Sequence, residues 1–158
     1  MTCVTFRNGI MASDGRVTDD SDIFSNKCQK IFRLKDSSLL GLAGDAATQE
    51  IVDLFNKRDF PTVKKLKALE IDFTGIFVKP DGSIQLVEVS RPKEEDKSSQ
   101  WTAIVFEIKE PFIAIGSGSK YALGAMERGA TAEQAVKVSI KFDSSCGGPT
   151  QVYQLVEE

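Results

Sequence analysis

The stretch TCVTFRNGIMASDG (residues 2–15) contains two short runs of strand-forming residues on either side of Asn8 and Gly9. Asn-Gly is the strongest two-residue signal for a β-hairpin, because both residues accept the positive φ angles of a type I′ turn. The sequence therefore predicts that the chain enters a sheet near its N-terminus and that its first two strands are adjacent and antiparallel.

The composition limits the classes of protein to which the chain can belong. A length of 158 residues with 41% hydrophobic residues suffices for one core, so we expect a single domain over residues 1–158. The net charge of −3 leaves no excess of Lys or Arg to neutralise phosphates. No apolar run approaches the ~20 residues of a membrane span, and the N-terminus lacks a secretory pattern. We expect a cytoplasmic protein that binds neither nucleic acid nor membranes.

The sequence contains no histidine, and this absence restricts its chemistry most. Histidine is the usual general base near neutral pH, so a Ser-His-Asp or Cys-His hydrolase is excluded. Any nucleophile must be activated by a lysine, a carboxylate or the α-amine of the chain, which has an ordinary pKa of ~7.7–8. Thr2 is a candidate nucleophile because removal of Met1 before a small residue would leave a free threonine amine.

The order of the remaining elements predicts the fold class. We expect hairpins at residues 29–44 and 71–89, the second around Pro80-Asp81-Gly82, an exposed loop at 90–100, and strands at 101–108 and 111–115. Helices are expected at 45–58, at 61–70 with Pro61 in the first turn, at 119–130, and from Thr131 to 143, before a last strand from Pro149. This order indicates an α+β layered sandwich in which helices cover the outer faces of sheets.

The stretch FIAIGSGSKYALGA (residues 112–125) combines a strand, a glycine-rich turn and the start of a helix. Gly116, Gly118 and Ala122 have the spacing of a dinucleotide-binding turn. That motif also needs a returning parallel strand, whereas a second helix follows here, and only about forty residues remain. The alternative is a tight turn in which Ser117 or Ser119 caps the helix.

Five segments in order resemble the proteasome β-subunit and HslV-type peptidases, the threonine-protease branch of the N-terminal nucleophile hydrolases. These segments are IMASDGRVT, KCQKIFRL, LLGLAGDAA, GSGSKYA and FDSSCGGPTQVYQL, and the resemblance runs from Thr2 to the final strand. It implies a four-layer αββα sandwich of two antiparallel sheets covered by helices. Cys146 stands where the family has a serine, which should weaken its hydrogen bond to the catalytic network.

The resemblance also implies the site. Thr2 is the nucleophile, Lys30 paired with Asp14 activates it, and the Gly44 N–H stabilises the oxyanion. Ser117, Asp143 and Cys146 surround the threonine amine. The residues expected to bind substrate are Val17, Thr18, Cys28, Leu42 and Ala46, which suggests a medium-sized apolar side chain in the first specificity pocket. Hydrolysis by these groups needs no metal and no cofactor.

By the same resemblance, we expect a threonine endopeptidase that acts on peptides or unfolded proteins and is the peptidase subunit of a self-compartmentalising, homo-oligomeric ring. Members of the family are often fed by an ATPase unfoldase. Two alternatives stay open from the sequence: a catalytically inactive relative that forms a structural or regulatory ring, and an amidohydrolase with the same N-terminal chemistry that acts on a small amide.

Overall fold

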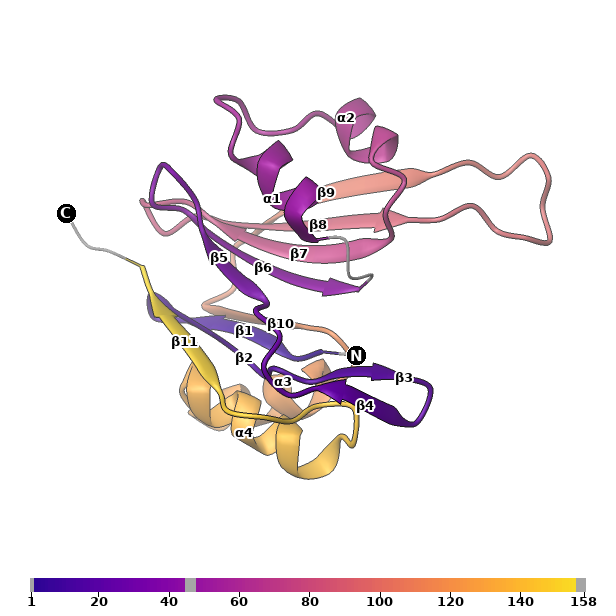
Figure 1. Cartoon of the computed structure of the whole chain (residues 1–158). Helices are drawn as coiled ribbons and strands as arrows, with labels where there is room; N and C mark the ends of the chain where they lie inside the picture. The colour runs from indigo at the N-terminus through magenta and orange to yellow at the C-terminus, as the bar shows by residue number, and fades with distance from the viewer. Residues whose placement is uncertain (1, 45–47, 156–158) are drawn as a thin grey trace.

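The computed structural model describes residues 2–44 and 48–155. They are arranged in four layers, with two helices above one sheet, a second sheet below it, and two further helices beneath (Figure 1). The predicted αββα sandwich of two antiparallel sheets is therefore confirmed.

The lower sheet contains the N-terminal hairpin. Its strand order is β10 (Phe112–Ile115), β1 (Val4–Arg7), β2 (Ile10–Ser13) and β11 (Gln151–Gln154), and every neighbouring pair is antiparallel. In the hairpin, Val4 pairs with Ser13 and Arg7 with Ile10. Asn8 and Gly9 have φ angles of 51° and 75°, as a type I′ turn requires, so the predicted turn is confirmed.

The upper sheet is a meander in which each strand pairs with the next one along the chain. Its strands are β5 (Ile31–Arg33), β6 (Leu39–Gly44), β7 (Phe73–Val78), β8 (Ile84–Ser90) and β9 (Thr102–Ile108). The predicted hairpins at residues 29–44 and 71–89 are both present. The polar loop between β8 and β9 extends away from the body of the molecule (Figure 1).

Helices α1 (Thr48–Phe55) and α2 (Val63–Ala68) cover the upper sheet, and α3 (Ser119–Glu127) and α4 (Ala132–Phe142) cover the lower one. α2 is capped by Thr62, so the placement of Pro61 in its first turn was wrong. α4 begins with a complete capping box between Thr131 and Gln134. The N-cap of α3 is Gly118, so the alternative in which Ser117 or Ser119 caps this helix does not hold. No helix in the described part of the chain is both long and apolar enough to cross a membrane.

Three hydrophobic clusters fill the three spaces between the four layers. The cluster between the sheets includes Val4, Met11, Ile31 and Ile76, all fully buried. Clusters on the outer faces join the upper sheet to α1 and α2, and the lower sheet to α3 and α4. Because side chains alternate along each strand, both faces of both sheets supply core residues. The two sheets are thereby fixed relative to each other, and the ends of their strands position the site.

A small hairpin of β3 (Val17–Asp19) and β4 (Asp22–Ser25) was not predicted. The sequence here is polar, and the two large apolar residues of β4, Ile23 and Phe24, are both exposed, so no alternation marks a buried face. Asp20 has a φ angle of 52° and makes the turn. β3 matters for function because it lines a pocket beside Thr2.

Candidate active site

Thr2 is separated from the start of β1 by Cys3 alone, and only 6% of its surface is exposed. Because β1 pairs with β10, the turn after β10 runs alongside Thr2, and the Gly118 N–H donates to the Thr2 carbonyl oxygen at 3.3 Å. Gly116 has a φ angle of 94°, and a Cβ atom at this position would overlap the Thr2 carbonyl oxygen. The glycine-rich turn therefore holds the backbone of Thr2.

Asp14 and Lys30 form a buried ion pair close to this position. Lys30 Nζ lies 2.9 Å from Asp14 Oδ1 and donates to the Arg16 carbonyl oxygen at 2.7 Å. The Asp14 carboxylate also accepts backbone N–H groups from Cys3 at 3.0 Å, Gly147 at 3.1 Å and Arg16 at 3.2 Å. A buried carboxylate with four donors has its hydrogen-bonding capacity well satisfied and holds the lysine in one position. The hydrogen bond from the Cys3 N–H connects the Asp14 carboxylate to the residue that follows Thr2.

Ser117, Asp143 and Cys146 form a second polar group on the helical side of the lower sheet. The Ser117 hydroxyl donates to Asp143 Oδ2 at 2.8 Å, and Cys146 Sγ lies 3.6 Å from the same oxygen. Partial burial alone would raise the pKa of the Asp143 carboxyl, but hydrogen bonds from the Ser117 hydroxyl and the Ser145 N–H give a net downward shift. A thiol is a weak hydrogen-bond donor, so the Ser117 hydroxyl is the stronger partner of this oxygen.

A pocket of about 220 Å³ opens at Thr2 on the side of β3. Its lining includes most of the predicted site residues, namely Thr2, Lys30, Gly44, Val17, Thr18, Cys28 and Leu42. Ala46 lies outside the described residues. Gly44, the last residue of β6, has a φ angle of 126°, and a Cβ atom there would come within 2.7 Å of the Asp72 carbonyl oxygen. The structure thus brings most of the predicted substrate-binding residues together around Thr2 and Lys30.

Other residues of this region were not assigned a role from the sequence. Arg16, Gln29, Ala43 and Thr48 also line the pocket. The Arg16 side chain donates to Asn26 Oδ1 and to the Ser144 carbonyl oxygen, each at 2.9 Å. Gln151 Nε2 donates to the Cys28 carbonyl oxygen at 2.7 Å. Arg16 lies in the segment IMASDGRVT, which carries part of the resemblance, but nothing local to Gln151 indicates that β11 supports the segment leading to Lys30.

A second pocket of about 350 Å³ opens on another side of Thr2. Its lining shares Thr2, Ala43 and Gly44 with the first pocket and adds Asp72, Thr74, Gly116 and Ser117. Across residues 2–44 and 48–155, no three His, Cys, Asp or Glu side chains gather in a way that could hold a metal ion.

Comparisons with known proteins relate this geometry to one family. A family model described as Proteasome subunit matches residues 2–58. The structure of BPH from Thiobacillus denitrificans has a TM-score of 0.64 and 22% identity and covers 99% of each chain. BPH from the same organism in complex with epoxomicin has a TM-score of 0.62 and 21% sequence identity, and the match covers 98% of each chain. HslV from Trypanosoma brucei has a TM-score of 0.69 and 15% sequence identity, and the match covers 96% of this chain and 97% of the HslV chain.

The fold is therefore that of these BPH and HslV structures over nearly the whole chain. The sequence match to proteasome subunits covers the segment that contains Thr2, Asp14, Lys30 and Gly44. The predicted resemblance is confirmed.

Proposed function

We propose that the protein is a threonine peptidase in which Thr2, exposed as the N-terminal residue by removal of Met1, is the nucleophile. The observation that carries this proposal is the buried Asp14–Lys30 pair, because Lys30 lines the same pocket as Thr2 and no histidine is available as a base. A fixed ammonium beside a hydroxyl favours its ionised form and disfavours protonation of a nearby amine.

In the first step the Thr2 Oγ attacks the carbonyl carbon of the scissile peptide bond, and its proton passes to the Thr2 α-amine. The carbonyl oxygen becomes an oxyanion, for which the Gly44 N–H is the proposed donor. One such donor contributes about 2.7–4 kcal/mol to transition-state stabilisation in a comparable hydrolase. The C–N bond then breaks, the leaving amine takes the proton from the α-amine, and the acyl group stays on Thr2 as an ester.

In the second step a water molecule hydrolyses the ester. The Thr2 α-amine takes a proton from the water, the hydroxyl attacks the ester carbon, and Thr2 Oγ leaves and regains a proton. Ser117 and Asp143 hydrogen-bond to each other at 2.8 Å beside this position and would orient the amine and the water. Each proton that leaves one group is received by another group of the chain or the substrate.

The first pocket is the proposed binding site for the substrate side chain that precedes the scissile bond. Val17, Leu42 and the Cys28 thiol supply apolar walls, and the volume of about 220 Å³ suits a medium-sized apolar side chain. The peptide would bind extended beside Thr18 and the end of β6, because a strand-like peptide satisfies its backbone groups by pairing. A homo-oligomeric ring served by an ATPase unfoldase is the proposed cellular setting, and the match to proteasome subunits supports it.

The proposal is tested with a panel of unstructured peptides and with epoxomicin, which is bound by BPH of similar fold. Protein whose intact mass shows the loss of Met1 should cleave the peptides after medium-sized apolar residues, and epoxomicin should abolish the cleavage. Cleavage that persists unchanged in excess epoxomicin, or no cleavage by the processed protein, would contradict the proposal.

A further inference from the structure

The second pocket beside Thr2 has no role in the function proposed above. We propose that it binds the side chain of the substrate residue that follows the scissile bond, and that it favours lysine at this position. This inference rests on the proposed peptidase function and specifies the substrate on the leaving-group side of the reaction.

The register of the sheets explains how the pocket is built. In the upper sheet Ala43 pairs with Thr74, and the next inward residues of β7, Ile76 and Val78, belong to the cluster between the sheets. Because side chains alternate along a strand, Thr74 faces the lower sheet, as do Ile76 and Val78. Opposite it lie Gly116 and Ser117, which follow β10. The cavity of about 350 Å³ therefore lies at the open end of the space between the sheets.

The two pockets meet at the nucleophile. Thr2, Ala43 and Gly44 line both of them, whereas the remaining residues of each pocket differ. A peptide whose carbonyl carbon is at Thr2 Oγ, with the preceding side chain in the first pocket, must leave in another direction after the scissile bond. The second pocket offers that direction, and its Ser117 is the partner of Asp143 beside the leaving amine.

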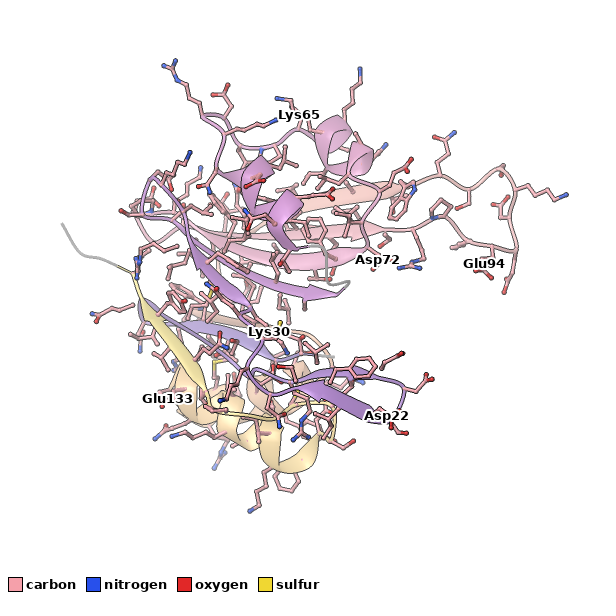
Figure 2. The ribbon with its side chains drawn as sticks, viewed as in Figure 1. Asp22, Lys30, Lys65, Asp72, Glu94 and Glu133 are labelled. Atoms are coloured by element: carbon pink, nitrogen blue, oxygen red, sulfur yellow. The ribbon has the colours of Figure 1, made fainter. Side chains whose placement is uncertain are left out.

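The charges of the two pockets are opposite. The first contains Arg16 and Lys30 and no carboxylate among its described residues, whereas Asp72 is the one charged side chain that lines the described part of the second. Asp72 lies immediately before β7, at the end of the upper sheet (Figure 2). A cationic side chain would therefore be attracted by the carboxylate of the second pocket and would gain no such attraction in the first.

Arg91 does not saturate the Asp72 carboxylate. Its backbone N–H and its Nε both approach Oδ2, at 3.1 and 3.4 Å. Among residues 2–44 and 48–155, no donor reaches the other oxygen, Oδ1. The ion pair is exposed, with 58% of the Arg91 side chain and 39% of Asp72 accessible, so it neutralises the charge only weakly.

A lysine side chain suits this cavity for a second reason. Its four methylene groups can lie along Ala43 and the Gly116 backbone while the ammonium group reaches Asp72 Oδ1. The hydroxyl of Thr74, two residues after Asp72 and in β7, offers a further acceptor. A glutamate at the same substrate position would meet the Asp72 charge and lose affinity for the same reason that lysine gains it.

The test uses matched peptides that differ only in the residue after the scissile bond, which is Lys, Met or Glu. Wild-type protein without Met1 should give kcat/KM values in the order Lys, Met, Glu, with about a fivefold difference at each step. Asp72→Asn should lower the value for the Lys peptide and raise it for the Glu peptide. Arg91→Gln should strengthen the preference for lysine, because it removes the competing cation.

Asp53→Asn is the matched control, because Asp53 is an exposed aspartate on α1 that accepts a hydrogen bond from Gln49. It should leave the order and the ratios unchanged. Equal cleavage of the three peptides, or an Asp72→Asn effect of the same size on all three, would overturn the inference and leave the peptidase function intact. Failure to cleave any peptide would overturn the proposed function and, with it, this inference.

Discussion

Lys30 Nζ lies 2.9 Å from Asp14 Oδ1, and 0% of Asp14 and 5% of Lys30 are exposed to solvent. The two residues come from different parts of the molecule: Asp14 follows β2 in the lower sheet, and Lys30 precedes β5 in the upper one. The ion pair thus joins the two sheets directly beside Thr2. Its removal should affect both the stability of the protein and its chemistry.

Substitution Asp14→Asn should lower the free energy of unfolding by about 3–5 kcal/mol, because it leaves the Lys30 ammonium buried without its counter-charge. Urea unfolding followed by circular dichroism measures the change. The matched control is Glu133→Gln, which breaks the exposed pair with Lys137 at 3.4 Å and should cost no more than about 0.5 kcal/mol. Equal losses in the two variants would contradict the buried pairing.

Substitution Gly116→Ala should lower kcat/KM for peptide cleavage by about 100-fold, because the new Cβ would displace the Thr2 carbonyl and shift the nucleophile. The positive φ angle of 94° adds strain for alanine. Gly124→Ala in α3 is the control, since a Cβ atom there meets nothing within 4 Å. It should keep full activity and raise stability by about 0.5–1 kcal/mol. Full activity of Gly116→Ala would show that this turn does not position Thr2.

Arg16 should act as a positioning residue for the loop that carries Asp143. Its side chain bonds to the Ser144 carbonyl, while its backbone contacts both Asp14 and Lys30. Arg16→Ala should therefore lower kcat by about 10- to 100-fold and speed hydrogen exchange at residues 143–148. Added guanidinium ions at low concentration should restore part of kcat, which a purely structural role would not allow.

Arg33→Ala is the control for Arg16, because Arg33 also donates to a backbone carbonyl, that of Gln154, at 2.6 Å. It lies away from both pockets beside Thr2. It should change neither kcat nor the exchange of residues 143–148. The same loss of kcat in both variants, with no recovery in guanidinium, would contradict the positioning role of Arg16.

The buried thiols predict a fall in stability at alkaline pH. Burial raises the pKa of Cys3 to about 11 and that of Cys146 to about 12, from an ordinary value of 9.0. In this range the folded protein keeps protons that the unfolded chain releases, so the free energy of unfolding falls as the pH rises above about 9. Cys146→Ala should make the fall from pH 8.5 to 10.5 shallower, as measured by urea unfolding. An identical fall in both proteins would contradict the assigned pKa shift.

The sequence predicted the elements whose local signals agree with their tertiary setting. Asn8-Gly9 fixed the first hairpin, and the Thr131 capping box marked the start of α4. The β3–β4 hairpin was not predicted because its large apolar residues, Ile23 and Phe24, are exposed. They therefore do not produce the alternation of buried and exposed residues that marks a strand. Ser117 was given a helix-capping alternative, since its partner Asp143 lies 26 residues away and no local pattern shows it.

The residues of the site that lie in motifs of characteristic spacing could be predicted from the sequence. The contacts between residues of different sheets could not. The resemblance to proteasome β-subunits and HslV implied that Asp14 pairs with Lys30, and the structure places the two in contact. The second pocket could not be predicted, because it forms only when Thr74 of one sheet faces Gly116 of the other. Gln151 is another such residue, since its bond to Cys28 depends on how β11 packs near the entry to β5.

The most direct test of the central claim compares wild-type protein with Thr2→Ala, after intact-mass measurement has shown that both have lost Met1. Alanine is also small enough for Met1 to be removed, so the two proteins differ only by the nucleophile. We expect wild type to cleave an unstructured peptide and Thr2→Ala, although folded, to leave it intact. Equal cleavage rates for the two proteins would contradict the assignment of Thr2 as the nucleophile.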